Sequence, residues 1–464
     1  MSARAFRRGM ILLLAMWLAP AVVAASQPVD DEVEQTGEEE AQDDDELSWE
    51  LSARVRPRGE ARFNQHFGFT EDRLARSVQP DEAAMLTQQT RLSAGVERAE
   101  LSGRLTLQHT AQWGEFGGDE LTHPPLQLYE GWISYEPVDE VAVDLGRFEL
   151  AYGDERVLGA VGWSQQGRTW DGLRTRIHPV DDINVDVFGA RYGSGEGSAF
   201  ANDSYLTGLY ATAEDPFDQV LAAADLYLLY DLRSAAAGPG LPDENNQLPQ
   251  DDDPAGGDNE DELPEAVGEQ RQLTMIGTRL VFDWAGLDAT MEAAGQFGSF
   301  CPDPGEGLSC RASLRPIRAF FADLEVGYSV DLFRGFVAAS IAPGDDPETD
   351  TIEGYQEMYP TGHAFLGYMD LIGPRTNILE YRGGAELNFD AIRAELAAHY
   401  FQQFEPVASP LGTELNLKVF ADATEGLSIG AGGGLFIPAR DMTVIDERPQ
   451  GLASWTFLQA TGVF

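Results

Sequence analysis

Apolar and polar residues alternate with a period of two along many short stretches of this chain. In residues 49–58, tryptophan, leucine and valine fall on one side, while Arg54, Arg56 and Arg58 fall on the other. Comparable alternation recurs over the stretches 88–96, 99–110, 222–232, 276–284, 392–400 and 414–419. Because the side chains of a β-strand point alternately to its two faces, this pattern predicts strands with one apolar and one polar face.

Such strands occur both in soluble sandwiches and in membrane barrels, so alternation alone does not decide between them. Two features favour the barrel. The apolar faces stay free of charge over about nine to eleven residues, the length of a tilted membrane strand. The chain also ends on an aromatic residue, Phe464, within a final alternating stretch. We therefore predict an all-β fold, a single large antiparallel transmembrane β-barrel of about 18 strands over residues 48–464.

The N-terminus has the layout of a secretory signal peptide. Three arginines lie within the first eight residues, and the apolar stretch 10–18 precedes small residues at Ala24 and Ala25. An apolar stretch of about nine residues is too short to cross a bilayer as a helix. Residues 1–24 are therefore predicted to be removed on export, and a multi-pass barrel is expected in the outer membrane of a Gram-negative cell.

Two acidic segments carry much of the formal net charge of -47. Residues 30–46 and 238–269 each contain eleven acidic residues and no basic residue. We predict that 25–47 is a solvated, disordered acidic segment before the barrel and that 238–269 is an acidic loop insert within it. Calcium binding at 251–253 or 258–262 is the alternative, although neither run has the spacing of a calcium loop. A charge this negative argues against nucleic acid as a partner.

Cys301 and Cys310 are the two cysteines of the chain. They flank a short stretch rich in glycine and proline, which predicts a loop. In an exported protein two such cysteines are expected to form a disulfide. Zinc would need more ligands than two thiols, and no histidine lies close to them in the sequence. No cofactor is expected.

Ionisable residues of both signs gather between residues 129 and 176, beside Trp163 and Trp170. Both signs are interleaved with glycine there, which indicates a polar network inside a channel. The candidate pore-lining or solute-binding residues of this block are Arg147, Asp154, Glu155, Arg156, Arg168, Asp171, Arg174 and Arg176. Four arginines on the polar faces of predicted strands complete the set: Arg54, Arg56, Arg91 and Arg104.

This set of charged residues allows two interpretations. In the first, the arginines form a ladder that attracts carboxylates and passes them along, and the interspersed acids hold the arginines in place. In the second, the same charges form a closed salt-bridge network that braces the barrel wall. Alternation fails around residues 147–156, so no side can be assigned there, whereas Arg174 and Arg176 share one strand face.

Signs of enzymatic chemistry are weak in this sequence. No H-E-x-x-H metal motif occurs. Asp154 and Glu155 are adjacent, so on a strand they would point to opposite faces and could not flank one glycosidic bond. His363 is expected to be a hydrogen-bonded turn residue. We therefore expect no enzymatic activity.

Three stretches, in order along the chain, resemble the alginate-export family of outer-membrane barrels. They are 146–174 (GRFELAYGDERVLGAVGWSQQGRTWDGLR), 358–370 (MYPTGHAFLGYMD) with Asn377 after it, and 411–439. The resemblance covers roughly residues 48–464 and implies a barrel of about eighteen strands whose arginine-rich lumen passes an anionic polysaccharide. By position it also implies roles for Gly146, Arg147, Tyr152, Gly153, Asp154, Glu155, Arg156, Gly167, Arg168, Asp171, Gly172 and Arg174.

The leading hypothesis is therefore a channel for export or diffusion of an alginate-like anionic polysaccharide, surrounded by outer-membrane lipid. A periplasmic secretion protein is a candidate partner. The first alternative is a porin-like channel for small solutes, because acidic loops and a negative net charge suit cations or neutral sugars. The second alternative is a structural or binding barrel that docks a partner through the acidic tail at residues 30–46.

Overall fold

The computed structural model describes residues 47–64, 67–70, 73–76, 82–113, 126–192, 204–217, 220–233, 270–301, 314–346, 348–405, 409–439 and 451–464. Eighteen strands form one sheet, and a short hairpin of two further strands lies outside it. The strands are β1 (Ser48–Phe63), β2 (Phe67–Thr70), β3 (Arg73–Arg76), β4 (Glu82–Arg98), β5 (Leu101–Gln112), β6 (Gln127–Val138), β7 (Val141–Phe148), β8 (Trp170–Val180), β9 (Ile183–Tyr192), β10 (Ser204–Phe217), β11 (Leu221–Arg233), β12 (Gln270–Trp284), β13 (Leu287–Cys301), β14 (Arg315–Val330), β15 (Phe333–Ala342), β16 (Ile378–Phe389), β17 (Ile392–Gln403), β18 (Pro410–Thr424), β19 (Leu427–Pro438) and β20 (Ala453–Val463).

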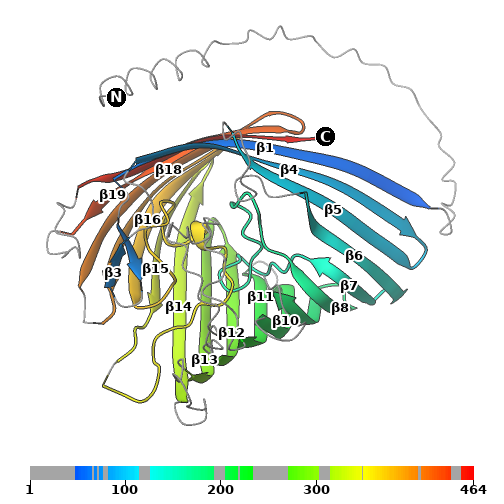
Figure 1. Cartoon of the computed structure of the whole chain (residues 1–464), viewed down its shortest axis with the longest axis horizontal. Helices are drawn as coiled ribbons and strands as arrows, with labels where there is room; N and C mark the ends of the chain where they lie inside the picture. The colour runs from blue at the N-terminus through cyan, green and yellow to red at the C-terminus, as the bar shows by residue number, and fades with distance from the viewer. Residues whose placement is uncertain are drawn as a thin grey trace, which may run out of the picture. The chain divides into compact units, whose positions relative to one another are not determined.

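From β4 to β20 each strand pairs with the next, and β1 closes the ring by pairing with both β4 and β20 (Figure 1). The pairing is antiparallel; for example, Val55 lies opposite Thr90 on β4 and opposite Gly462 on β20. Closure leaves the wall without a free strand edge, as a bilayer requires, because lipid offers no hydrogen-bond partners. The predicted single antiparallel barrel is confirmed, with eighteen strands.

The connections at one end of the barrel are tight turns. Ala99, Ala285, Asp331 and Asp390 adopt left-handed backbone conformations there, with φ between 44° and 52°. Tight hairpins favour this conformation because its twist matches that of the flanking strands. The first strand begins at this end and the last strand finishes at it. Short turns are typical of the periplasmic end, so the long connections belong to the outer end.

Apolar side chains cover the outward face of the strands. Leu226, Val337 and Leu396 expose 57%, 66% and 57% of their surface. Positions next to them in sequence face the interior, where Asp225 is only 3% exposed. This arrangement is the reverse of a soluble protein, and it suits a wall whose outer solvent is hydrocarbon and whose interior is polar.

Two of the long connections turn into the interior of the barrel (Figure 1). The first inner segment, residues 149–169, joins β7 to β8, and the second inner segment, residues 343–377, joins β15 to β16. Buried side chains of both segments, among them Leu158 and Tyr359, form one cluster with inward-facing wall residues such as Trp170. The buried apolar cluster therefore lies inside the ring of strands, where it helps to hold both segments.

Several predicted features lie outside the described residues. These are the signal peptide, nearly all of the acidic segment 25–47, the insert 238–269 with its calcium candidates, and Cys310. Cys301, the last residue of β13, is disulfide-bonded. In the described part of the chain, no helix has the length and apolar character needed to cross a membrane.

Replacing Leu226 with arginine is expected to destabilise the barrel in lipid by about 2–4 kcal/mol, because a guanidinium would enter the hydrocarbon. Leu226 lies near the middle of β11 and faces outward. Urea unfolding from lipid vesicles, followed by tryptophan fluorescence, measures the change in the free energy of unfolding. The matched control Leu226→Met should change it by less than about 1.5 kcal/mol. An equally small effect of arginine would contradict the lipid-facing assignment.

Candidate functional site

A short parallel bridge joins the two inner segments. The Gly159 N–H donates to the Tyr359 carbonyl at 2.8 Å, and the Tyr359 N–H donates to the Val157 carbonyl at 3.1 Å. The Thr361 N–H donates to the Glu155 carbonyl at 2.9 Å, and the Thr361 hydroxyl donates to the Glu155 carboxylate. The backbone carbonyl and the carboxylate of Glu155 therefore both hold the two segments together.

Arg168 strengthens the same junction. Its Nη1 donates to the carbonyls of Gly159, Tyr359 and Pro360 at 3.2, 2.5 and 3.1 Å. Gly167 has φ of 74° and brings the chain so close to the wall that a Cβ there would lie 2.6 Å from the Tyr129 hydroxyl. A larger residue would have to move the wall and would be strained at this φ. In this geometry Arg168 braces backbone.

Two arginines of β1 tie the first inner segment to the wall. Arg56, which is 3% exposed, donates to the carbonyls of Gly162 and Ser164 at 2.7 and 2.5 Å. Arg58 donates to the Trp163 carbonyl at 2.7 Å, and its guanidinium lies 4.1 Å from the centre of the Trp163 ring. These bonds satisfy carbonyls that the segment would otherwise leave unpaired in the interior.

Arg54 and Arg91 lie beside this contact, directly opposite each other on β1 and β4. Arg91 donates to Gln108 at 2.7 Å, lies over the Tyr129 ring at 3.5 Å and forms a long ion pair with Glu149 at 3.8 Å. The Arg54 side chain has no hydrogen bond or ion pair within the described part of the chain. Like charges placed opposite each other on a sheet repel, so this pair is a positive site suited to an anionic group.

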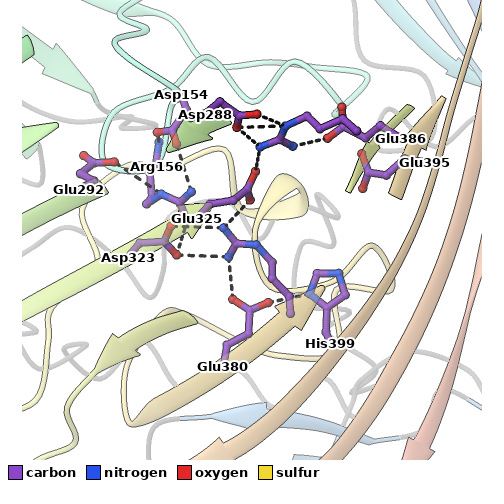
Figure 2. Close-up of polar contacts among 12 residues, drawn as sticks. Asp154, Arg156, Asp288, Glu292, Asp323, Glu325, Glu380, Glu386, Glu395 and His399 are labelled. Carbon is purple, nitrogen blue, oxygen red and sulfur yellow. Dashed lines mark hydrogen bonds and ion pairs between the residues drawn. The ribbon is translucent and has the colours of Figure 1, made fainter. Parts of the chain in front are cut away.

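Carboxylates dominate the wall from β13 to β17. We call them the acidic wall, which consists of Asp288, Glu292, Asp323, Glu325, Glu380, Glu386 and Glu395. Arg156 of the first inner segment enters this wall and lies 3.1 Å from Asp323 and 3.5 Å from Glu292 (Figure 2). It also pairs with Asp154 at 3.1 Å. Burial alone would raise the pKa of Asp154, but the charges of Arg156 and Arg279 lower it below its usual range.

The ion pairs continue without a break along the acidic wall (Figure 2). Asp323 pairs with Arg382 at 3.2 Å, and Arg382 pairs with Glu325 at 3.1 Å. Glu325 pairs with Arg334 at 2.9 Å, and Arg334 also contacts Glu386 at 2.7 Å. One connected network of ion pairs therefore reaches from the first inner segment along the acidic wall. Acidic residues outnumber arginines in this network.

The remaining predicted arginines of the interior are paired with acids. Arg174 and Arg176 share the inward face of β8, and both contact Asp144 on β7, at 2.8 and 3.0 Å. Arg104 pairs with Glu50 at 2.8 Å near the tight-turn end. These arginines extend the positive side of the interior away from Arg54 and Arg91, with their charge partly balanced.

Arg147 and Asp171 face away from the interior. Their side chains pair at 2.6 Å and 2.7 Å in the same outward rows as the exposed Leu145 and Leu173. The break in alternation that obscured this region has a simple cause, because β7 ends at Phe148 and the inner segment begins. Arg147 and Asp171 therefore do not contribute to the interior charge.

Sequence reasoning missed the acidic wall and most of the second inner segment. Asp323 and Glu325 lie on the polar face of an alternating stretch, so the period-two pattern could have found them. Arg375 had no such signal. It is 1% exposed and donates to the carbonyl of Arg156 at 3.4 Å, a contact between residues far apart in the chain.

The described residues contain no group of three or more side chains arranged to hold a metal ion. His363 lies in the short 3-10 helix η2 (Gly362–Ala364), where Nδ1 bonds to Asp370 at 2.9 Å. The stretch 426–430, GLSIG, has the spacing of a nucleophile elbow. Gly426 lies in the turn between β18 and β19, and 427–430 begin β19, so this is not a strand-to-helix turn and it lacks the context that the motif needs.

No family model matches the chain, and no curated protein matches it. Solved outer-membrane porins nevertheless share its fold. A BenF-like porin from Pseudomonas fluorescens Pf-5 has a TM-score of 0.56 at 9% identity, over 90% of this chain and 98% of the porin. Acinetobacter baumannii OccAB1 has a TM-score of 0.56 at 10% identity, over 90% and 96%. Pseudomonas aeruginosa OpdK, solved with vanillate, has 0.54 at 8% identity, over 89% and 98%.

These likenesses establish the fold. Together with the closed eighteen-stranded ring and its apolar outer face, they indicate a multi-pass outer-membrane β-barrel that shares its fold with the solved porins. The comparisons support the predicted localisation. They do not support the finer assignment to the alginate-export family.

Replacing Arg156 with methionine is expected to release the first inner segment from the acidic wall. The loss should be about 3–5 kcal/mol, because buried carboxylates would lose their counter-charge. Hydrogen exchange measured by mass spectrometry should then be faster in peptides that cover residues 149–169. The control is Arg393→Met, since Arg393 and Asp422 form an exposed pair and such pairs contribute about 0–1 kcal/mol. Unchanged exchange after Arg156→Met would mean that other contacts hold the segment.

Proposed function

We propose that this protein is a porin-like channel that lets small charged solutes cross the outer membrane. The observation that carries the proposal is the pair of Arg54 and Arg91, which places two positive charges beside the inner segments. Strands of the acidic wall lie far round the ring from β1 and β4, so opposite charges border the interior. Such a field favours solutes that carry a carboxylate, and most of all those that also carry a positive group.

The contacts that attach the first inner segment to the barrel wall favour a small solute over a polymer. Arg56 and Arg58 bind its backbone to β1, while Arg156 binds it to β13 and β14, so the segment crosses the interior. A polysaccharide chain would have to thread through the space beside this segment along its whole length or displace buried ion pairs, whereas a small solute needs only that space once. This favours the porin-like alternative over the export of an anionic polysaccharide.

In the proposed channel some of the predicted residues contact the solute and others brace the inner segments. Arg54 and Arg91 contact the solute, and Arg174 and Arg176 continue the positive side of its path. The residues that brace the inner segments are Glu155, Arg156, Arg168 and Arg56. Arg147 and Asp171, which face outward, take no part. The acidic tail at 30–46 lies outside the described residues, so docking through it stays a prediction.

Replacing Arg54 with glutamate is expected to lower the anion-to-cation permeability ratio by about thirtyfold or more. A unit charge acts on an ion about 4 Å away with about 1 kcal/mol in water, and about 1.4 kcal/mol is tenfold. The replacement changes the charge by two units and acts in opposite directions on anions and cations. Reversal potentials in planar bilayers under a salt gradient measure the ratio. The matched control is Arg147→Glu, an equal charge change on the outward face, which should leave the ratio unchanged. No shift for Arg54→Glu would remove Arg54 from the solute path.

Solute size is tested by the swelling of liposomes that contain the protein. Rapid swelling is expected in isotonic glutamate or lysine, and slow swelling in a uronate oligomer of similar charge density. Titration of single channels with polyuronate supplies the second measurement, and the polymer should leave the current unchanged. Entry and transient block by the polymer would overturn the proposal and restore polysaccharide export as the main function.

A further inference from the structure

A cavity of about 340 Å³ lies between the two inner segments and the inward faces of β18 to β20. It is separate from the Arg54 and Arg91 pair, which does not line it. The aromatic residues that line the cavity are Trp163, His363, Tyr368, Phe420, Trp455 and Phe457. Six of its thirteen lining residues therefore carry rings, which distinguishes it from the ion-pair networks elsewhere in the interior.

The rings pack tightly against one another, so the cavity has a fixed shape. Trp163 and His363 stack with ring centres 4.4 Å apart and an interplanar angle of 9°. Phe457 meets Trp163 edge-on at 5.0 Å and lies 5.1 Å from Trp455. Aromatic groups in these arrangements attract each other and resist rearrangement, so the cavity is kept open by its own walls.

His363 supplies the polar chemistry of the cavity. Its Nδ1 lies 3.0 and 2.9 Å from the two oxygens of Asp370. A carboxylate only accepts hydrogen bonds, so Nδ1 carries the proton, and Nε2 of the neutral ring is an acceptor. His363 is 4% exposed, and Nε2 has no partner among the described residues. A buried acceptor without a donor is unfavourable, which points to a ligand that donates.

The other polar groups at the cavity already have partners. The Glu155 carboxylate accepts from Thr361 and from the Ala160 N–H, and Lys418 pairs with Glu395 at 2.9 Å. The Trp455 indole donates to Glu60 at 3.2 Å. A sugar would bring several hydroxyls and find one free acceptor, and a carboxylate would be buried without a free counter-charge. Both classes are therefore disfavoured.

We propose that this cavity is a binding site for a small neutral aromatic molecule with one hydrogen-bond donor, of the phenol class. The ring occupies the aromatic cavity, and its hydroxyl donates to Nε2 of His363. A volume of about 340 Å³ accommodates a single substituted ring, at the small end of known ligand pockets. This site goes beyond the passage of charged solutes and does not depend on the proposed function.

The test is isothermal titration calorimetry of the purified full-length barrel in detergent, with phenol, toluene and benzoate as probes. Gly162→Leu should fill the cavity, because Gly162 lines it and a Cβ there meets nothing within 4 Å. Any heat that remains with this variant therefore measures uptake of the probe into the micelles. Saturable binding of phenol is expected in the natural protein and should be lost in Gly162→Leu. Toluene should bind about fivefold more weakly than phenol, since it lacks the donor.

His363→Phe keeps a ring at this position and removes the acceptor. It should weaken phenol binding about fivefold and leave toluene binding unchanged. Equal phenol affinity in His363→Phe and the natural protein, tighter binding of benzoate than of phenol, or no saturable phenol binding would each overturn the inference. Should His363→Phe fail to fold, the phenol–toluene difference and Gly162→Leu still decide. Reversal potentials separate the two proposals, because this site should not affect them.

Discussion

The ion pairs of one buried residue, Arg156, connect the parts of the interior. Arg156 belongs to the first inner segment, yet its guanidinium lies among Asp154, Glu292 and Asp323. In a membrane barrel the wall turns its polar face inward, so apolar contacts alone cannot hold a segment there. A buried guanidinium is stable only with matched counter-charges, and buried carboxylates need it in turn. The position of the segment across the interior follows from this mutual requirement.

The position of that segment determines what the neighbouring arginines can do. Arg56 and Arg58 bind its carbonyls and brace it, and Arg91 contacts it through Glu149 and the Gln166 carbonyl. The Arg54 side chain, next along β1, has no such contact within the described part of the chain. Bracing and solute contact are therefore divided between neighbours on the same strands in the proposed channel. The same segment also closes off the aromatic cavity, because Trp163 contributes to its wall.

Sequence reasoning succeeded where backbone geometry alone fixes the outcome. The alternation in 49–58 and 392–400 predicted which face of β1 and β17 is apolar, because successive side chains on a strand must point to opposite sides. It failed at Arg147, since the strand ends one residue later and nothing in the local pattern marks the inward turn. The acids Asp323 and Glu325 follow the alternation and were open to prediction, whereas the buried contact of Arg375 was not.

Local patterns in the sequence are enough to predict the barrel, its membrane-facing surface and the approximate number of its strands. These properties depend on a period of two and on the length of apolar faces, which are local features of the chain. Which arginines brace the inner segments and which keep an unpaired side chain depends on how the chain folds. That outcome depends on contacts such as Arg156 with Asp323 and Arg56 with Gly162, and these join residues more than a hundred positions apart. Local sequence patterns cannot predict such contacts, because the contacts form only when the ring closes and two connections fold into the interior.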